Sequence, residues 1–168
     1  MDAMSVYIAN LGKYVEGEEV GAWFTLPVNI EDVKERIGLN SEYEECAIHD
    51  CDNIPFEVDE YMSLEELNRC YYLLEEIEDK IPMDDLKAVM DGSGYSVDEL
   101  AEHIDDVYIY EGIGDMEELA RYRIDEEQVL GEIPEKLRYY IDYSAYARDL
   151  EIEGYFVVGN HGIYEICM

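Results

Sequence analysis

Acidic residues alternate with apolar residues along this chain, at the spacings of amphipathic helices and half-buried strands. The 168 residues include 43 Asp and Glu against 11 Lys and Arg, which gives a net charge of −32. That charge divides into −12 over residues 1–61, −10 over 62–105 and −10 over 106–168, so no single tail holds it. Because 48% of the residues are hydrophobic, the chain can bury real cores, and the carboxylates belong to folded surfaces.

Such a surface needs an explanation, because repulsion between like charges destabilises a compact state. A solvated acidic surface and adaptation to high salt are the ordinary explanations. The alternative is a surface that imitates nucleic acid or meets a basic partner. Sixteen tyrosines fit poorly with the low hydrophobicity expected of salt adaptation, but composition alone leaves these alternatives open.

Short runs of alternating apolar and polar residues predict strands near both ends of the chain. Gly12 and Gly17 bracket a polar turn after the first run. The segment Gly159-Asn160-His161-Gly162 joins the last two runs as a hairpin, in which Asn and Gly supply positive dihedral angles. The predicted strands cover residues 5–10, 20–26, 46–50, 107–110, 155–158 and 163–166.

Capping residues and a period near 3.6 predict helices between these strands. Asn29 can cap a helix that Gly38 ends, whereas Ser63 and Ser96 each open a capping box with a Glu three residues later. Further helices are predicted at 83–90, after Asp115, after Pro134 and after Asp142. The residues expected on buried helix faces include Ile30, Val33, Ile37, Leu67, Tyr71, Leu74, Ile77, Leu86, Val89, Met90, Leu100, Ile104, Met116, Leu119 and Ala120.

These elements predict an α+β fold made of three small domains in a row. Residues 1–61 are expected to form a small β-sheet plus a helix, residues 62–105 a helical middle domain, and residues 106–168 a mixed α/β domain.

The stretch Leu130–Leu150 differs from the rest of the chain, because its charges nearly cancel to −1 and it holds four tyrosines. Tyr139, Tyr143 and Tyr146 follow a helical spacing, and Leu137 and Tyr140 lie among apolar residues on the other side. A segment that is apolar on two sides needs two surfaces to cover it. We therefore expect one side to pack on its own domain and the other to meet a partner subunit.

No catalytic, cofactor or metal motif is recognisable in the sequence. Cys46, His49 and Cys51 lie close together, but a zinc site needs a fourth ligand, and a strand with a bystander histidine is the better interpretation. The four cysteines form no regular framework and are expected to be reduced thiols. Without an apolar run long enough to cross a bilayer, or a signal peptide, the chain is expected to be cytoplasmic and not to bind membranes.

Several long motifs occur in the order found in one known family. They are MSVYIANLGKYVEGEEVGAWFTLPVNIEDVKERIGLNSEYEECAIHD, FEVDEYMSLEELN, LGEIPEKLRYYIDYSAYARDL and NHGIYEI. Together they resemble the ArdA antirestriction proteins over nearly the full length. The resemblance implies a DNA mimic from a mobile genetic element, which binds the methyltransferase core of type I restriction-modification enzymes instead of nucleic acid. It also implies an elongated homodimer of three small domains, in which 130–150 is the antirestriction motif.

Mimicry would place carboxylates along a path like that of duplex DNA, which carries one charge per roughly 1.7 Å of axis. The near-neutral motif imitates phosphate poorly and is expected to form core and dimer contacts through Leu137, Tyr139, Tyr140, Tyr143 and Tyr146. An acidic binding module for another basic DNA-binding protein is the first alternative, and a salt-adapted housekeeping protein or unrecognised enzyme is the second. The candidate mimicking carboxylates are Glu65, Glu66, Glu75, Glu76, Asp79, Asp98, Glu99, Glu102, Asp105, Glu117, Glu118, Asp125 and Glu126.

Overall fold

The computed structural model describes residues 3–167 and has an α+β fold, as the sequence predicts. Two compact units divide the chain, one ending at Ile77 and the other beginning at Glu78, and each contains a three-stranded antiparallel sheet. The division into three small domains stays a prediction. Within residues 3–167, no helix is both long and apolar enough to cross a membrane.

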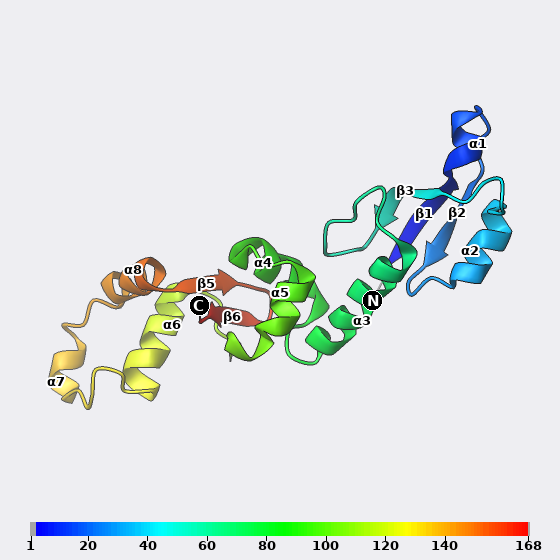
Figure 1. The fold of residues 1–168 in the computed structure, drawn as a ribbon. Helices are drawn as coiled ribbons and strands as arrows, with labels where there is room; N and C mark the ends of the chain where they lie inside the picture. The colour runs from blue at the N-terminus through cyan, green and yellow to red at the C-terminus, as the bar shows by residue number, and fades with distance from the viewer. Residues whose placement is uncertain (1–2, 168) are drawn as a thin grey trace. The chain divides into compact units, whose positions relative to one another are not determined.

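The sheet of the first unit has the strand order β2-β1-β3, with β1 in the centre (Figure 1). One face is apolar, because Val6 and Ile8 of β1 are fully buried together with Val33 and Ile37 of α2. The elements of this unit are β1 (Ser5–Asn10), α1 (Leu11–Val15), β2 (Gly21–Thr25), α2 (Ile30–Ile37), β3 (Cys46–Asp52) and α3 (Leu64–Glu78), whose last residue begins the second unit.

Asparagine side chains cap the N-termini of both short helices in this unit, α1 and α2. The Asn29 side chain accepts hydrogen bonds from the first-turn amides of α2, and Gly38 ends that helix with a φ of 72°, as predicted. The polar turn predicted after β1 was wrong, since α1 occupies that segment. Asn10 explains the helix: its Oδ1 accepts from the amide of Lys13 at 3.1 Å, while its buried Nδ2 donates to Ile37 O at 3.0 Å.

Helix α3 begins at the predicted capping residue, since the Ser63 hydroxyl accepts from the amide of Glu66 at 3.1 Å. Its buried face differs from the prediction at one position, because Cys70 is buried where Tyr71 was expected. Tyr71 is half-buried and its hydroxyl donates to Glu75 at 3.1 Å, which keeps a polar ring edge near water. The Asn68 amide joins the helix to its own unit by two hydrogen bonds with the backbone of Val28, at 2.7 and 2.8 Å.

The second unit contains a sheet of order β4-β6-β5 with helices before it and between its strands. Leu100 is buried as predicted, but Ile104 is only half-buried because α5 ends at Glu102 and a 3₁₀ turn follows. The elements are α4 (Met83–Ser93), α5 (Val97–Glu102), η1 (Ile104–Asp106), β4 (Val107–Glu111), α6 (Met116–Arg121), the π-helical turn η2 (Tyr122–Glu126), α7 (Glu135–Arg138), α8 (Tyr143–Glu153), β5 (Tyr155–Val158) and β6 (Gly162–Ile166).

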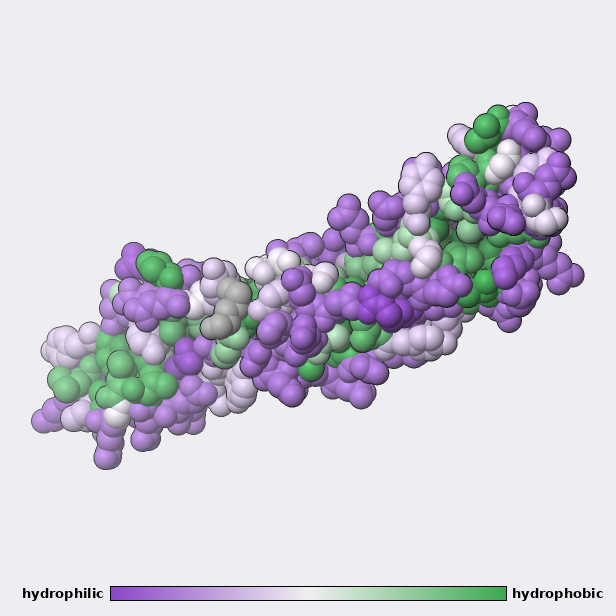
Figure 2. Space-filling model, viewed as in Figure 1, coloured by the Kyte–Doolittle hydropathy of each residue, from purple (hydrophilic) through white to green (hydrophobic). Residues whose placement is uncertain are grey.

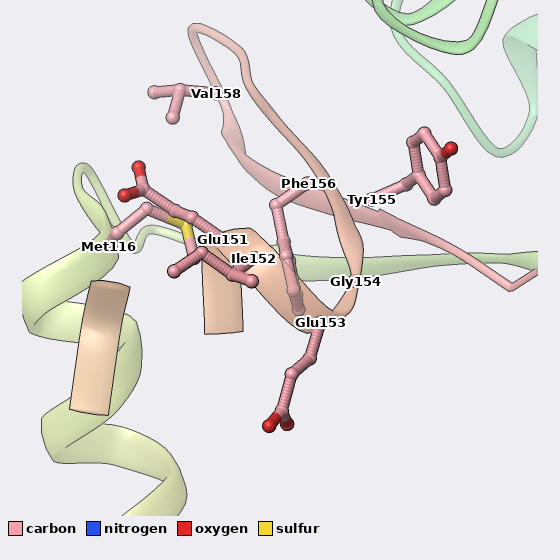
Figure 3. Close-up of a pocket in the computed structure, with 8 residues that line it drawn as sticks. All are labelled: Met116, Glu151, Ile152, Glu153, Gly154, Tyr155, Phe156 and Val158. Atoms are coloured by element: carbon pink, nitrogen blue, oxygen red, sulfur yellow. The ribbon is translucent and has the colours of Figure 1, made fainter. Parts of the chain in front are cut away.

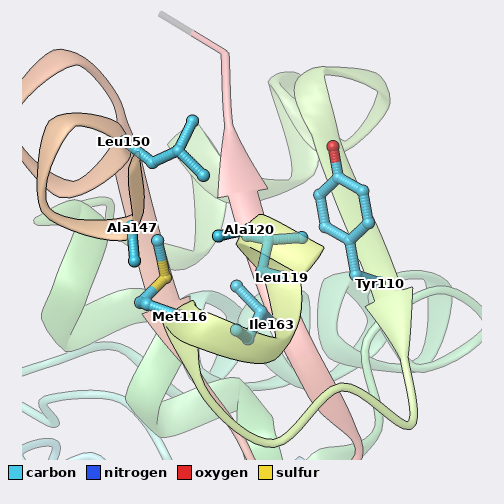
Figure 4. Close-up of a cluster of buried hydrophobic side chains, with 7 residues drawn as sticks. All are labelled: Tyr110, Met116, Leu119, Ala120, Ala147, Leu150 and Ile163. Atoms are coloured by element: carbon cyan, nitrogen blue, oxygen red, sulfur yellow. The ribbon is translucent and has the colours of Figure 1, made fainter. Parts of the chain in front are cut away.

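The apolar core between α6, α8 and the sheet is drawn in Figure 4. Met116, Leu119 and Ala120 of α6 are buried in it as predicted, beside residues of β4, β6 and α8. Tyr143 and Tyr146 pack against this cluster from α8. The remaining buried members are Tyr110, Ala147, Leu150 and Ile163.

The hairpin of β5 and β6 forms as predicted, but the basis proposed for its turn was wrong. None of the turn residues 159–162 has a positive φ. Instead, Asp85 of α4 is fully buried, and its carboxylate accepts from the amides of Asn160 at 2.5 Å and His161 at 2.9 Å. It also contacts the His161 ring at 3.2 Å and accepts from the Tyr164 hydroxyl at 2.7 Å. A side chain from α4, 75 residues earlier, therefore fixes the turn.

Candidate functional site

Most of the candidate carboxylates fall into two groups according to their place along a helix. The first group lies in the first turn of α3, α5 or α6, where a negative charge stabilises the helix dipole by roughly 0.3–1 kcal/mol. Its members are Glu65, Glu66, Asp98, Glu99, Glu117 and Glu118. Helix stability by itself explains why acidic residues occupy these six positions.

Capping contacts hold several of these first-turn side chains. The Glu99 carboxylate accepts from both the amide and the hydroxyl of Ser96 at 2.9 Å, which completes the predicted capping box and lowers the pKa of Glu99. The Glu118 carboxylate accepts from the amide of Gly114 at 2.8 Å, and its own amide donates to Asp115 at 2.8 Å. Both carboxylates therefore stabilise the first turns of their own helices.

The second group lies at or beyond the last turn of a helix, where a negative charge is unfavourable. Glu75 and Glu76 are near the end of α3 and Glu102 is the last residue of α5, and neither helix has a basic residue in its last turn. Asp79 lies just past the end of α3 and is exposed. Asp105 is also exposed, but it lies in the first turn of η1 and pairs with Lys80 at 3.7 Å. Helix stability does not explain the positions of Glu75, Glu76, Asp79 and Glu102, so these four are the stronger candidates for contact with a partner.

Glu117, of the first group, and Asp125 are both engaged within the second unit. Glu117 accepts from the Ser144 hydroxyl at 2.6 Å and pairs with Arg121 at 2.7 Å, and these contacts lower the pKa of its carboxyl. Asp125 accepts from the Tyr143 hydroxyl at 3.0 Å. Both carboxylates join the α6–η2 segment to α8. The Glu126 carboxylate, by contrast, is exposed and makes no hydrogen bond or ion pair with any residue in 3–167.

The carboxylates of the unfavourable kind that the sequence prediction omitted include Glu151 and Glu153, in the last turn of α8. They lie beside a pocket of about 460 Å³ where α8 ends and β5 begins (Figure 3). Figure 3 shows Glu151 and Ile152 near Met116, with the carboxylate of Glu153 pointing away from them. Their place before Gly154, in a helix without a basic last turn, is the signal that could have identified them. The other lining residues are Gly154, Tyr155, Phe156 and Val158.

The stretch 130–150 divides into a packed part and an exposed part. Helix α7 ends at Arg138 and α8 begins at Tyr143, so the single helical face predicted for Tyr139, Tyr143 and Tyr146 does not form. Tyr143 and Tyr146 contact the core, as expected. Tyr139 and Tyr140 are 89% and 85% exposed, which excludes them from the core of this chain.

Leu137, next to these two tyrosines, is 53% exposed. Val129 and Leu130, where the stretch begins, are also exposed. Figure 2 shows hydrophobic residues gathered over the segment around α7, whereas hydrophilic residues cover most of the rest of the visible face. The acidic surface therefore has an apolar patch, formed by Val129, Leu130, Leu137, Tyr139 and Tyr140, which we call the α7 patch.

A comparison with known protein families identifies the family of this acidic chain. The chain matches the family model described as Antirestriction protein (ArdA) over residues 6–165, which is nearly its whole length. It therefore belongs to the ArdA antirestriction family, and membership implies an antirestriction function. No curated protein matches the chain.

Proposed function

We propose that the chain is a DNA mimic that occupies the DNA-binding groove of a type I restriction-modification enzyme and so blocks restriction and modification. The observation that carries this proposal is the set of exposed carboxylates at helix C-termini, at Glu76, Glu102, Glu151 and Glu153. Each of these charges weakens its own helix, and the net charge of −32 adds repulsion to that cost. Contact with a strongly basic partner explains why they are present.

The mechanism is competitive occupation of the groove. Proteins that bind DNA hold its backbone with Lys and Arg, and much of the affinity is electrostatic and independent of sequence. A folded protein that offers carboxylates to the same basic residues can fill the groove without any cost of bending or unwinding DNA. Association steered by charge is fast and becomes weaker as salt rises.

A competition assay tests the proposal directly. A purified type I methyltransferase is bound to labelled DNA, and the protein is titrated in at salt concentrations from about 50 to about 200 mM. We expect DNA to be displaced at low salt, with the effect weakening as the salt concentration rises. Failure to displace DNA at low salt from a susceptible enzyme would contradict the proposal. Capture of other basic DNA-binding proteins, without restriction subunits, would instead support a general acidic binding module.

We further propose that two copies of the chain associate through the stretch 130–150, and that the chain is organised as three small domains. The α7 patch supports the first statement, because Leu137, Tyr139 and Tyr140 are exposed and would be covered by a second copy. Sedimentation of the free protein measures the number of subunits. Limited proteolysis, with cleavage near residues 61 and 105 expected first, tests the three domains.

A further inference from the structure

The sheet of the first unit has one face that α2 does not cover. Val6 and Ile8 of β1 point toward α2 and are fully buried. Side chains alternate along a strand, so Tyr7 lies on the opposite face, and so does Trp23, its partner in β2. Trp23 is 45% exposed. An aromatic pair therefore lies at the surface of an acidic unit.

The two rings are held in a fixed arrangement. Their centroids are 5.7 Å apart with an angle of 64° between the ring planes, which is an edge-to-face contact. The Tyr7 ring lies against Gly21, where a Cβ atom would come within 2.8 Å of two ring atoms. Glycine at this position lets the ring lie low across β2, and the pair is ordered before any partner arrives.

A bulge in β3 brings carboxylates to the same face. Ile8 pairs with Ile48, and regular pairing would put His49 opposite Tyr7, but the register shifts and Asp50 lies there instead. Two residue pairs further along, Asp52 lies opposite Ser5 and so on the same face. Directly opposed residues share a face of the sheet, with Cβ atoms about 4.5–5.5 Å apart. Bulges are known to redirect side chains in this way.

Each of these carboxylates keeps an oxygen available for a partner. Asp50 Oδ1 accepts from the amide of Cys51 at 2.9 Å, and Asp52 Oδ2 accepts from the side chain of Asn53 at 3.2 Å. Neither carboxylate forms an ion pair with any residue in 3–167. Within residues 3–77, every basic residue lies on a helix, and these are Lys13, Lys34, Arg36 and Arg69.

We propose that this face, formed by Tyr7, Trp23, Asp50 and Asp52, is a binding site for the guanidinium group of an arginine side chain on a basic partner protein. A guanidinium is planar and weakly hydrated, so it stacks on an aromatic ring while its edge donates to carboxylates. A lysine ammonium cannot do both with the same geometry. Aromatic rings are no imitation of phosphate, so the site adds a contact that charge mimicry does not provide.

The single tryptophan of the chain makes the site observable. Because Trp23 is the only tryptophan, its fluorescence reports on this face and not on the many other carboxylates. The full chain is titrated with a capped hexa-arginine peptide and, separately, with hexa-lysine at the same ionic strength. We expect hexa-arginine to change the Trp23 emission with an apparent affinity about fivefold tighter than that of hexa-lysine. Equal midpoints and equal emission changes for both peptides would overturn the proposal.

A matched pair of variants separates the site from general acidity. The double variant Asp50→Asn/Asp52→Asn should bind hexa-arginine about fivefold more weakly and lose the preference over hexa-lysine. The control Glu35→Gln/Glu44→Gln removes the same charge from exposed positions outside the face and should keep the preference. If both doubles behave alike, the assigned site is wrong. No restriction enzyme is present, so this result is independent of the DNA-competition assay.

Discussion

The carboxylate of Asp85 accepts a hydrogen bond from the hydroxyl of Tyr164 at 2.7 Å, and both side chains are fully buried. Burial raises the pKa of the Tyr164 hydroxyl, and the adjacent carboxylate raises it further, so Tyr164 stays a donor. For Asp85, burial alone would raise the pKa of the carboxyl. The hydrogen bonds from His161, Tyr164 and Asn160 outweigh burial and leave that pKa below its usual value.

Replacing Asp85 with alanine should destabilise the second unit strongly. The change leaves the Tyr164 hydroxyl and the amides of Asn160 and His161 without their acceptor, at a cost of about 3–5 kcal/mol. Urea unfolding measures the loss. Asp84→Ala is the control, because its exposed side chain precedes Asp85 in the same turn and should cost less than about 1 kcal/mol. Equal losses would contradict the structural role of Asp85.

The same carboxylate predicts a dependence on pH. Because the folded pKa of Asp85 lies below its unfolded value of about 3.9, its contribution to stability is present above that value and is lost as pH falls through the lower folded pKa. As pH falls, protonation of the other carboxylates relieves their mutual repulsion, and this effect raises the stability of the fold. The measurable quantity is therefore the difference in unfolding free energy between the native chain and Asp85→Asn, which should shrink below about pH 4.

Carboxylates at opposite ends of helices should respond oppositely to the same change. Glu76→Gln and Glu102→Gln remove charges from last turns and should each stabilise the fold by about 0.3–1 kcal/mol, whereas Glu65→Gln in the first turn of α3 should destabilise it. Thermal unfolding at low salt shows the sign. In the competition assay, Glu76→Gln/Glu102→Gln should bind the methyltransferase more weakly despite its greater stability. If this double variant displaced DNA as well as the native chain does, neither residue would belong to the proposed binding surface.

The tyrosines of the stretch 130–150 should separate into two classes. Tyr139→Ser/Tyr140→Ser alters only exposed side chains, so unfolding of the chain should change little while self-association weakens. Tyr146→Ala removes packing against the core and should cost about 1–3 kcal/mol. Sedimentation and denaturant unfolding of both variants test this difference. If the variant Tyr139→Ser/Tyr140→Ser still formed a folded dimer, the interface would have to lie elsewhere on the chain.

Local signals predicted most helices and strands because neighbouring residues determine them. Asn29 and Gly38 define α2, and Ser96 with Glu99 defines the start of α5, through contacts within one turn of the chain. The polar turn expected after β1 was wrong because the local cap from Asn10 to Lys13 was not recognised. The second contact of Asn10, with Ile37 27 residues away, leaves no local pattern.

The candidate site was harder to predict, because identical residue types have different surroundings. Asp84 and Asp85 are neighbours in sequence, yet one is exposed and the other is fully buried by a hairpin formed from residues 155–166. The register shift at His49 is equally invisible, since Asp50 faces Tyr7 only through the pairing of two distant strands. Charge spacing could not distinguish a carboxylate that caps a helix from one that weakens it.

The buried carboxylate of Asp85 also has a consequence for biosynthesis. Its acceptor oxygens face donors at Asn160, His161 and Tyr164, and β6 is the central strand of its sheet. In a nascent chain that has emerged from the ribosome only as far as α8, the Asp85 carboxylate is still hydrated by water and β4 has no neighbouring strand. The second unit therefore completes its folding after residue 166 leaves the exit tunnel, whereas the first unit has all its strands once residue 52 has emerged.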